Sequence, residues 1–155
     1  MTKLTPEQIE LLRKPLPEEA ISQHPTKKFL STIKAIYVVE RLNEVFGIGE
    51  WYVSYEEIMS PNPTDPKLNK QVVVKGTLNI PDMAPIEQYG GNDNKDLGDA
   101  YKGAATDALT KIASYLEIGM DVYKGLSTPK GDETEINYDE PPVFEKPTKK
   151  PSFRI

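Results

Sequence analysis

Apolar residues recur every three or four positions between residues 96 and 117, and this is the longest helical pattern in the chain. On a helical wheel seven of them fall within roughly 120° of one another, namely Leu97, Tyr101, Ala104, Ala108, Ile112, Tyr115 and Leu116. Small residues on the same helix, such as Gly103, would allow close packing, and Gly119 is placed for a left-handed C-cap. The pattern predicts a helix over 96–117 whose apolar face lies on a sheet.

Two shorter helices are predicted in the N-terminal part of the chain. Thr5–Gln8 is a capping box with proline at the first helical position, which predicts a helix from residue 6 to about 14. A second apolar stripe predicts a helix over 31–46 that packs on the same sheet. Its charged residues gather on the opposite side, namely Glu40, Arg41 and Glu44. Ile33 and Tyr37 lie off the stripe, and we expect them to contact another element or a neighbouring protomer.

Stretches rich in Tyr and Val between the second and third helices predict strands. They are Trp51–Ile58, Gln71–Ile80 and the shorter Pro85–Gly90. Residues 60–66 include three prolines, which lack the amide donors of a sheet interior, so we expect a loop there. The glycines at 90 and 91 predict a turn after the third strand. The fold class that follows is α+β: an antiparallel three-stranded sheet packed by the long helix in a β-β-β-α core, with an additional N-terminal helical region.

The segment between the first two helices carries basic residues around a proline turn, namely His24, Lys27 and Lys28. A solvated connector and part of a binding surface are both open interpretations. After residue 125 the chain becomes proline-rich and charged, with too few apolar residues to offset the entropy cost of ordering. We therefore expect one domain, residues 1–125, and a flexible tail, residues 126–155.

The end of this tail places Lys149, Lys150 and Arg154 around Phe153. The favoured interpretation is a solubilising tail. The alternative is a short peptide that binds a partner, such as a single-stranded DNA-binding protein.

Composition argues against several kinds of chemistry. The 155 residues include no cysteine and one histidine, which removes disulfides, thiol catalysis, zinc–thiolate sites and histidine-rich metal sites. No apolar run approaches about 18 residues and no signal-like N-terminus is present, so we expect a cytoplasmic protein with no membrane partner. Phosphate-binding glycine loops, calcium loops and nucleophile elbows find no match. We expect neither an enzyme nor a cofactor.

The charge of the chain is mildly unfavourable for binding nucleic acid. The net charge is −5, and residues 25–125 carry 11 basic and 14 acidic residues. This balance argues against a general nucleic-acid coat but not against a local basic groove, because phosphate binding depends on the field at the site. The long helix cannot supply such a groove alone. Lys111 falls near one edge of its apolar stripe, whereas Lys102 and Lys95 fall beyond the opposite edge.

Several separate stretches resemble the Rad52 family of single-strand annealing proteins, including its phage recombinase members. The family's opening helix and "L-x-P-E-x-I-S" turn are similar to LTPEQIELLRKPLPEEAIS, with the proline one place early. Its "N-E-M-F-G-x-x-G-W" block is similar to NEVFGIGEW, with Gly49 one place early. Its second strand is similar to VVVKGTLNI, and its glycine turn after the third strand is similar to YGG. Its "R-K-E-A-x-T-D-G-L-K-R-A-L-R-x-F-G" helix is similar to YKGAATDALTKIASYLEIG. The resemblance covers about residues 4–125.

The resemblance implies a protein that binds single-stranded DNA and anneals complementary strands without ATP, in homologous recombination and DNA repair. It also implies that protomers assemble into a ring or helical arc, with the DNA in a basic groove around the outside. Bases would stay exposed to find a complement, and duplex stacking would supply the driving force.

The resemblance also assigns residues to DNA binding. The family's arginine after "I-S" corresponds to His24, and the lysine of "R-K-E-A" corresponds to Lys102. The family's basic run on the long helix corresponds to Thr110, Lys111 and Ser114, so only Lys111 keeps a charge. Lys27 and Lys28 lie near His24 in the sequence, and Lys95 and Lys102 could form a second DNA site on the far side of the helix. The expected DNA-binding residues are therefore His24, Lys27, Lys28, Lys95, Lys102 and Lys111. We expect weak binding per protomer, offset by the many protomers of a ring.

Two other functions stay open. The acidic core and the missing basic residues suggest a structural or interaction module that kept the fold and the ring but lost DNA binding. A double-stranded RNA binder of similar layout ranks last, because it would want lysines at a helix N-terminus where Asp96 and Asp99 stand.

Overall fold

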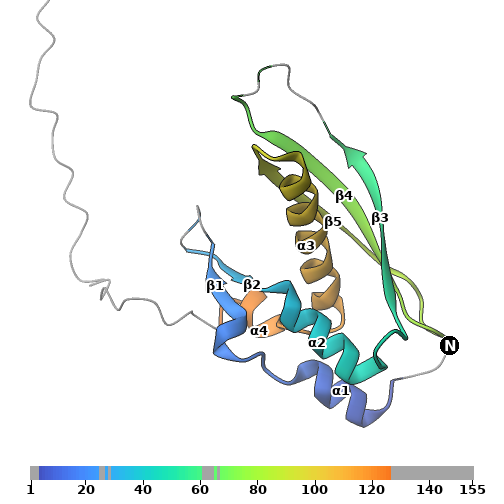
Figure 1. Cartoon of the computed structure of the whole chain (residues 1–155). Helices are drawn as coiled ribbons and strands as arrows, with labels where there is room; N and C mark the ends of the chain where they lie inside the picture. Colours follow the sequence, from blue (N-terminus) through green and yellow to red (C-terminus); the bar gives the residue numbers. More distant parts are fainter. Residues whose placement is uncertain (1–3, 25–26, 28, 61–64, 66, 127–155) are drawn as a thin grey trace, which may run out of the picture.

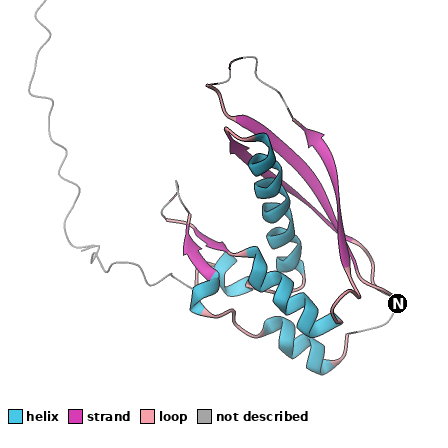
Figure 2. Cartoon of the chain, in the orientation of Figure 1, coloured by secondary structure: helices cyan, strands magenta, loops and turns pink. Residues whose placement is uncertain are grey.

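The computed structural model describes residues 4–24, 27, 29–60, 65 and 67–126. Its elements follow in the order α1 (Pro6–Arg13), a 3₁₀ turn (Glu18–Ala20), β1 (Ile21–Gln23), β2 (Ser31–Ile33), α2 (Ala35–Phe46), β3 (Tyr52–Met59), β4 (Lys70–Asn79), β5 (Ile86–Asn94), α3 (Leu97–Tyr115) and α4 (Met120–Tyr123). The strands β3, β4 and β5 form an antiparallel sheet in that order, and α3 lies along one of its faces (Figures 1 and 2). The predicted α+β class with a β-β-β-α core is confirmed.

The sheet and α3 touch backbone to backbone at Gly90. A Cβ atom built there would lie 2.1 Å from the carbonyl oxygen of Ala104 and 2.3 Å from the amide nitrogen of Ala108. Because no side chain fits between them, glycine is required where the helix crosses β5. The predicted turn at Gly90 and Gly91 is therefore wrong: β5 continues to Asn94, with Gly90 opposite Val74 and Gly91 opposite Val73 on β4.

A second layer of the core lies beside the lower end of the sheet, where α1 packs against α2 and α2 packs against α3 (Figure 1). Leu12 of α1, Leu42 of α2 and Ile112 of α3 belong to one buried cluster. Tyr37 packs against the same cluster, so its predicted contact with another element is confirmed. Arg41 is only 6% exposed, although the sequence placed it on the charged side of α2. Its guanidinium turns back to bind the end of α1 instead.

The segment before α2 forms a hairpin that the sequence did not predict. Ile21 of β1 pairs with Ile33 of β2, and Ser22 pairs with Thr32, whose hydroxyl lies 3.0 Å from that of Ser22. The helix predicted over 31–46 therefore begins only at Ala35. Ile33 is buried against Gly119, where an added Cβ would lie 2.4 Å from its Cδ1 atom.

The C-terminal end of α3 closes with two left-handed residues. Leu116 is the C-cap, and the left-handed Glu117 (φ 65°) follows it. The N–H of Glu117 donates to Ser114 O, and the N–H of Ile118 donates to Ala113 O. Gly119 (φ 66°) is left-handed as predicted, but it starts α4 instead of capping α3. The predicted apolar stripe of α3 is buried in its middle, while Leu97 and Tyr115 near its ends are exposed.

Three predictions lie wholly or mostly outside the described residues: the proline-rich loop of residues 60–66, the position of Lys28, and the tail of residues 126–155.

Candidate nucleic-acid interface

A groove lies between the β1–β2 hairpin and the helices α3 and α4. It measures about 580 Å³, and we call it the hairpin groove. The hairpin side of its lining is His24, Phe29, Leu30, Ser31, Thr32 and Ile33, and the opposite side is Asn92, Gly103, Thr106, Asp107, Thr110, Lys111, Val122, Tyr123 and Gly125. In Figure 1 the hairpin stands beside the lower half of α3, with α4 beneath it.

Short hydrogen bonds shape the hairpin end of the groove. The N–H of His24 donates to Leu30 O at 2.8 Å, and the N–H of Leu30 donates to Lys27 O at 2.8 Å. The N–H of Lys27 in turn donates to the Nδ1 atom of His24 at 3.1 Å. This contact requires an unprotonated Nδ1 atom, so the imidazole is held in a defined orientation at the groove.

Lys111 reaches the groove from α3, and its ammonium group is paired. Its Nζ atom lies 2.8 Å from Oδ2 of Asp107, one helical turn earlier. The same oxygen accepts the N–H of Gly91 at 2.9 Å, which fixes the carboxylate between α3 and β5. An anion that binds Lys111 therefore has to compete with Asp107.

The structure brings some of the predicted DNA-binding residues together and separates others. His24 and Lys111, far apart in sequence, line the same groove, and Lys27 is joined to His24. Lys102 and Lys95 do not line it. Lys102 is exposed, with its Nζ atom 3.5 Å from Asp99 Oδ1.

The side chain of Lys70 reaches the segment just before α3. The backbone oxygen of Lys95 accepts a hydrogen bond from Nζ of Lys70 at 2.8 Å, so Lys70, which sequence reasoning passed over, is near this end of the molecule. Lys111 lines the hairpin groove, whereas Lys95 and Lys102 lie outside it. This separation agrees with the helical-wheel argument that one helix cannot direct these three lysines at one ligand.

Two aromatic residues of the groove were missed in the sequence. Phe29 stands at the hairpin end of the lining, and Tyr123 stands on α4. Partial burial raises the pKa of Tyr123, and the negative charge of Asp107 adds to that effect, while a hydrogen bond with Thr110 opposes it. No spacing in the sequence marks either residue, because the groove forms only when the hairpin folds against α3 and α4.

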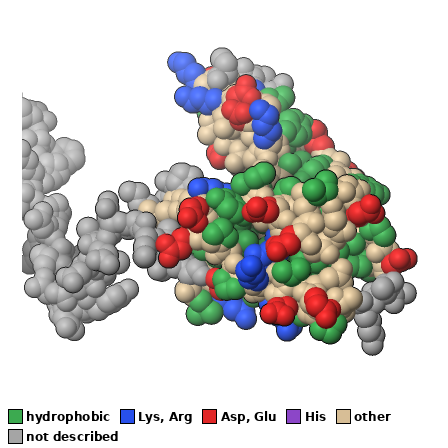
Figure 3. Space-filling model, turned by 60° about the horizontal axis from the view of Figure 1, so that its bottom comes forward, with side chains coloured by type: hydrophobic (Ala, Val, Ile, Leu, Met, Phe, Trp, Pro, Cys, Tyr) green, Lys and Arg blue, Asp and Glu red, His purple; other side chains and the backbone are tan. Residues whose placement is uncertain are grey.

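Elsewhere, some of the described basic side chains are paired with acids. Lys75 on β4 lies 3.2 Å from Glu56 and 3.7 Å from Glu87, and the contact with Glu56 is the main cause of its raised pKa. In the view of Figure 3, acidic side chains are scattered over the surface and the basic ones form no continuous band. The electrostatic case for DNA binding therefore rests on local sites.

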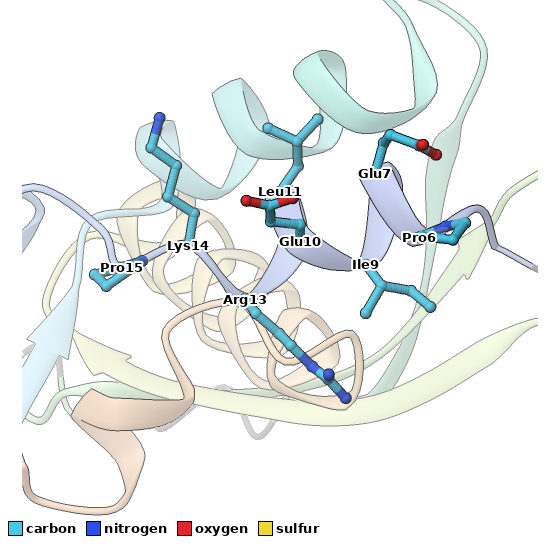
Figure 4. Close-up of a pocket in the computed structure, with 8 residues that line it drawn as sticks. All are labelled: Pro6, Glu7, Ile9, Glu10, Leu11, Arg13, Lys14 and Pro15. Carbon is cyan, nitrogen blue, oxygen red and sulfur yellow. The ribbon is translucent and has the colours of Figure 1, made fainter.

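Another hollow, of about 1040 Å³, lies against α1 and is lined by Pro6, Glu7, Ile9, Glu10, Leu11, Arg13, Lys14 and Pro15. In Figure 4, Leu11 points toward α2 and Arg13 points toward the end of α3, where its Nε atom lies 2.5 Å from Glu117. Leu11 packs against the buried core and Arg13 pairs with Glu117, and both contacts hold α1 in place. In the described part of the chain, no three His, Asp or Glu residues are grouped to hold a metal ion.

Comparison with family models matches residues 6–139 to the Rad52/22 family double-strand break repair protein. The chain belongs to the Rad52/22 family. The match spans most of the sequence and includes every described element. It supports a role in DNA recombination and repair, with DNA as a partner. A comparison with curated proteins gave no match. Among the described residues, none of the helices is both long and apolar enough to span a membrane.

Proposed function

We propose that this Rad52/22 family member binds single-stranded DNA and anneals complementary strands without ATP. The observation that carries the proposal is the hairpin groove, where His24 and Lys111 come together from opposite ends of the chain. In this proposal the groove receives the phosphate backbone, and protomers assembled in a ring or arc join their grooves into one path.

The chemistry of annealing requires no bond making by the protein. Lysine and histidine side chains hold the strand through its phosphates, and counterion release supplies much of the affinity. The free energy of the reaction comes from stacking and pairing in the new duplex. Because each groove offers few cations and Lys111 is paired with Asp107, each protomer binds weakly and the assembly binds through many grooves at once.

The experiment is an annealing assay with two complementary fluorescent oligonucleotides at low salt without ATP, on protein whose mass in solution is known. We expect a large oligomer that accelerates annealing. Lys111→Glu should abolish DNA binding, because it places a second carboxylate beside Asp107 in the groove. Lys67→Glu is the matched control. It makes the same charge change at an exposed lysine outside the groove that has no predicted role in DNA binding, and it should keep most of the activity.

A structural module without DNA binding is the second candidate, favoured by the carboxylate of Asp107 against Lys111. It predicts a large oligomer that neither binds nor anneals DNA, and no effect of Lys111→Glu in a binding assay. Loss of binding in Lys111→Glu, with Lys67→Glu unaffected, would contradict it.

A further inference from the structure

We propose that the hairpin groove also binds the bases of single-stranded DNA, with Phe29 and Tyr123 as stacking platforms beside the phosphate contacts of Lys111. This inference rests on the proposed function and adds residues for which neither the sequence pattern nor the family match gives a role. It follows that part of the affinity for single-stranded DNA comes from base stacking, which depends little on salt.

The first support is the exposure of apolar side chains at one groove. Phe29 is 84% exposed, Tyr123 47% and Leu30 44%, and all three line it. Single exposed apolar residues are ordinary on protein surfaces. Three that converge beside a lysine and a histidine match the composition of sites that bind single strands, where aromatic rings stack on bases and cations hold the backbone.

The second support is the scarcity of charge in the same groove. Its described lining contains the ammonium group of Lys111 and the imidazole of His24, and the carboxylate of Asp107 lies 2.8 Å from Lys111. Phosphate attraction alone would therefore fade at moderate salt. Stacking of one base on an aromatic ring strengthens binding by about tenfold, and salt hardly changes this contribution.

The state of Tyr123 suits such a contact. A tyrosine of ordinary pKa, about 10, is neutral at physiological pH, and partial burial raises the pKa of Tyr123 further, so the ring carries no negative charge toward the DNA. Phe29 stands on the opposite side of the groove, on the hairpin. A base that stacks on either ring can keep its pairing edge outside, which annealing requires.

The test compares two probes of equal length, an ordinary oligonucleotide and one whose sites are abasic, so that the phosphates are the same and only the bases differ. We expect the wild-type protein to bind the abasic probe at least about tenfold more weakly. Phe29→Leu and Tyr123→Leu should weaken binding of the ordinary probe and leave binding of the abasic probe unchanged. The slope of log affinity against log salt should stay the same in both variants, because no phosphate contact is lost.

The controls separate stacking from folding and from charge. Phe29→Trp should restore binding, since it keeps an aromatic face at a position exposed enough to accept it. Tyr89→Leu removes an exposed aromatic residue from β5 outside the groove and should have no effect. Lys111→Gln should reduce the salt slope with both probes.

Equal affinity of the wild-type protein for the two probes would overturn the inference while leaving the proposed function intact, as would unchanged binding in Phe29→Leu. If the wild-type protein binds neither probe, the proposed function and this inference both fail.

Discussion

Asp107 occupies the place where a phosphate would meet Lys111. Its Oδ2 atom accepts from both the lysine and the N–H of Gly91, so the carboxylate is fixed by the backbone of β5 and does not swing away when the lysine leaves it. Half-exposed pairs of this kind are worth up to about 1 kcal/mol. Under the proposed function, DNA has to offset that amount at every protomer.

Asp107→Asn should therefore tighten binding of single-stranded DNA, by about two- to fivefold per groove at low salt. The amide oxygen of asparagine can still accept the N–H of Gly91, so the variant keeps the fold. Binding would be measured by fluorescence anisotropy with a short oligonucleotide. Asp99→Asn is the matched control, because Asp99 pairs with Lys102 outside the groove. Unchanged or weaker binding in Asp107→Asn would show that Asp107 does not compete with the phosphate.

Gly90 determines how closely the long helix can approach the sheet. Alanine at this position would place its Cβ atom within 2.3 Å of two backbone atoms of α3, and backbone cannot move aside as a flexible side chain can. We expect Gly90→Ala to lower the free energy of unfolding by about 3 kcal/mol, near the upper end of overpacking costs.

The neighbouring glycine provides the control for this measurement. The nearest atom to a Cβ at Gly91 is the carbonyl oxygen of Val72, 3.7 Å away, which is ordinary contact. Gly91→Ala should therefore change stability by less than about 0.5 kcal/mol. Urea denaturation followed by Trp51 fluorescence compares the two variants. Equal stability of both would mean that α3 can shift from β5 at little cost.

At the level of elements, α1 is joined to α2 through a buried guanidinium. The Nη1 atom of Arg41 donates to the carbonyl oxygens of Leu11 and Lys14, both at 2.6 Å, and its Nε atom lies 3.3 Å from Glu44. The last carbonyls of a helix have no partner within the helix. Arg41 supplies one from a different helix, and this explains why an arginine is buried in the core layer.

Replacement of Arg41 should lower the free energy of unfolding, and the loss should grow with the number of hydrogen-bond donors removed. Arg41→Ala should destabilise the fold by about 3 kcal/mol and Arg41→Lys by about 1 to 2 kcal/mol, because a lysine cannot reproduce the planar fork. Arg13→Ala removes an exposed arginine paired with Glu117 and should cost less than about 1 kcal/mol. Denaturation midpoints in urea give the comparison, and a fully stable Arg41→Lys would contradict this role.

Sequence patterns located α3, which forms one wall of the groove, and most other elements, but not the β1–β2 hairpin or α4. The ends of α1, β3 and β4 were predicted to within one residue, and those of α3 to within two, because each has a capping box, a period or a run of β-branched residues. The strands β1 and β2 have three residues each, which is too short for any periodicity to show. His24 and Lys111 were expected through the family resemblance, whereas Phe29 and Asp107 were not. Phe29 meets the groove only when the hairpin folds. Asp107 stands one turn before Lys111 on α3, a spacing that the sequence does contain.

At the scale of the whole molecule, the surface offers an apolar area away from the hairpin groove. Ile36, Tyr37, Val39 and Ile48 line a hollow on α2 and the turn after it, together with Glu40 and Asn43. Ile48 is 86% exposed and Ile36 is 68% exposed. Grouped apolar side chains of this kind mark protein–protein contacts. If the protomers assemble as proposed, this area is a candidate for one side of a head-to-tail contact that closes into a ring.

Ile48→Asp should then reduce the mass of the protein in solution, because the charge would have to be buried without a partner at the contact. Annealing should fall with the mass, since many weak grooves no longer act on one strand. Leu68→Asp is the control, at an exposed apolar residue just before β4. Light scattering measures the mass, and circular dichroism checks that the smaller species is folded. A folded Ile48→Asp variant of undiminished mass would exclude this face as the contact between protomers. A folded monomer that binds short oligonucleotides yet fails to anneal would show that annealing requires the grooves of several protomers on one strand.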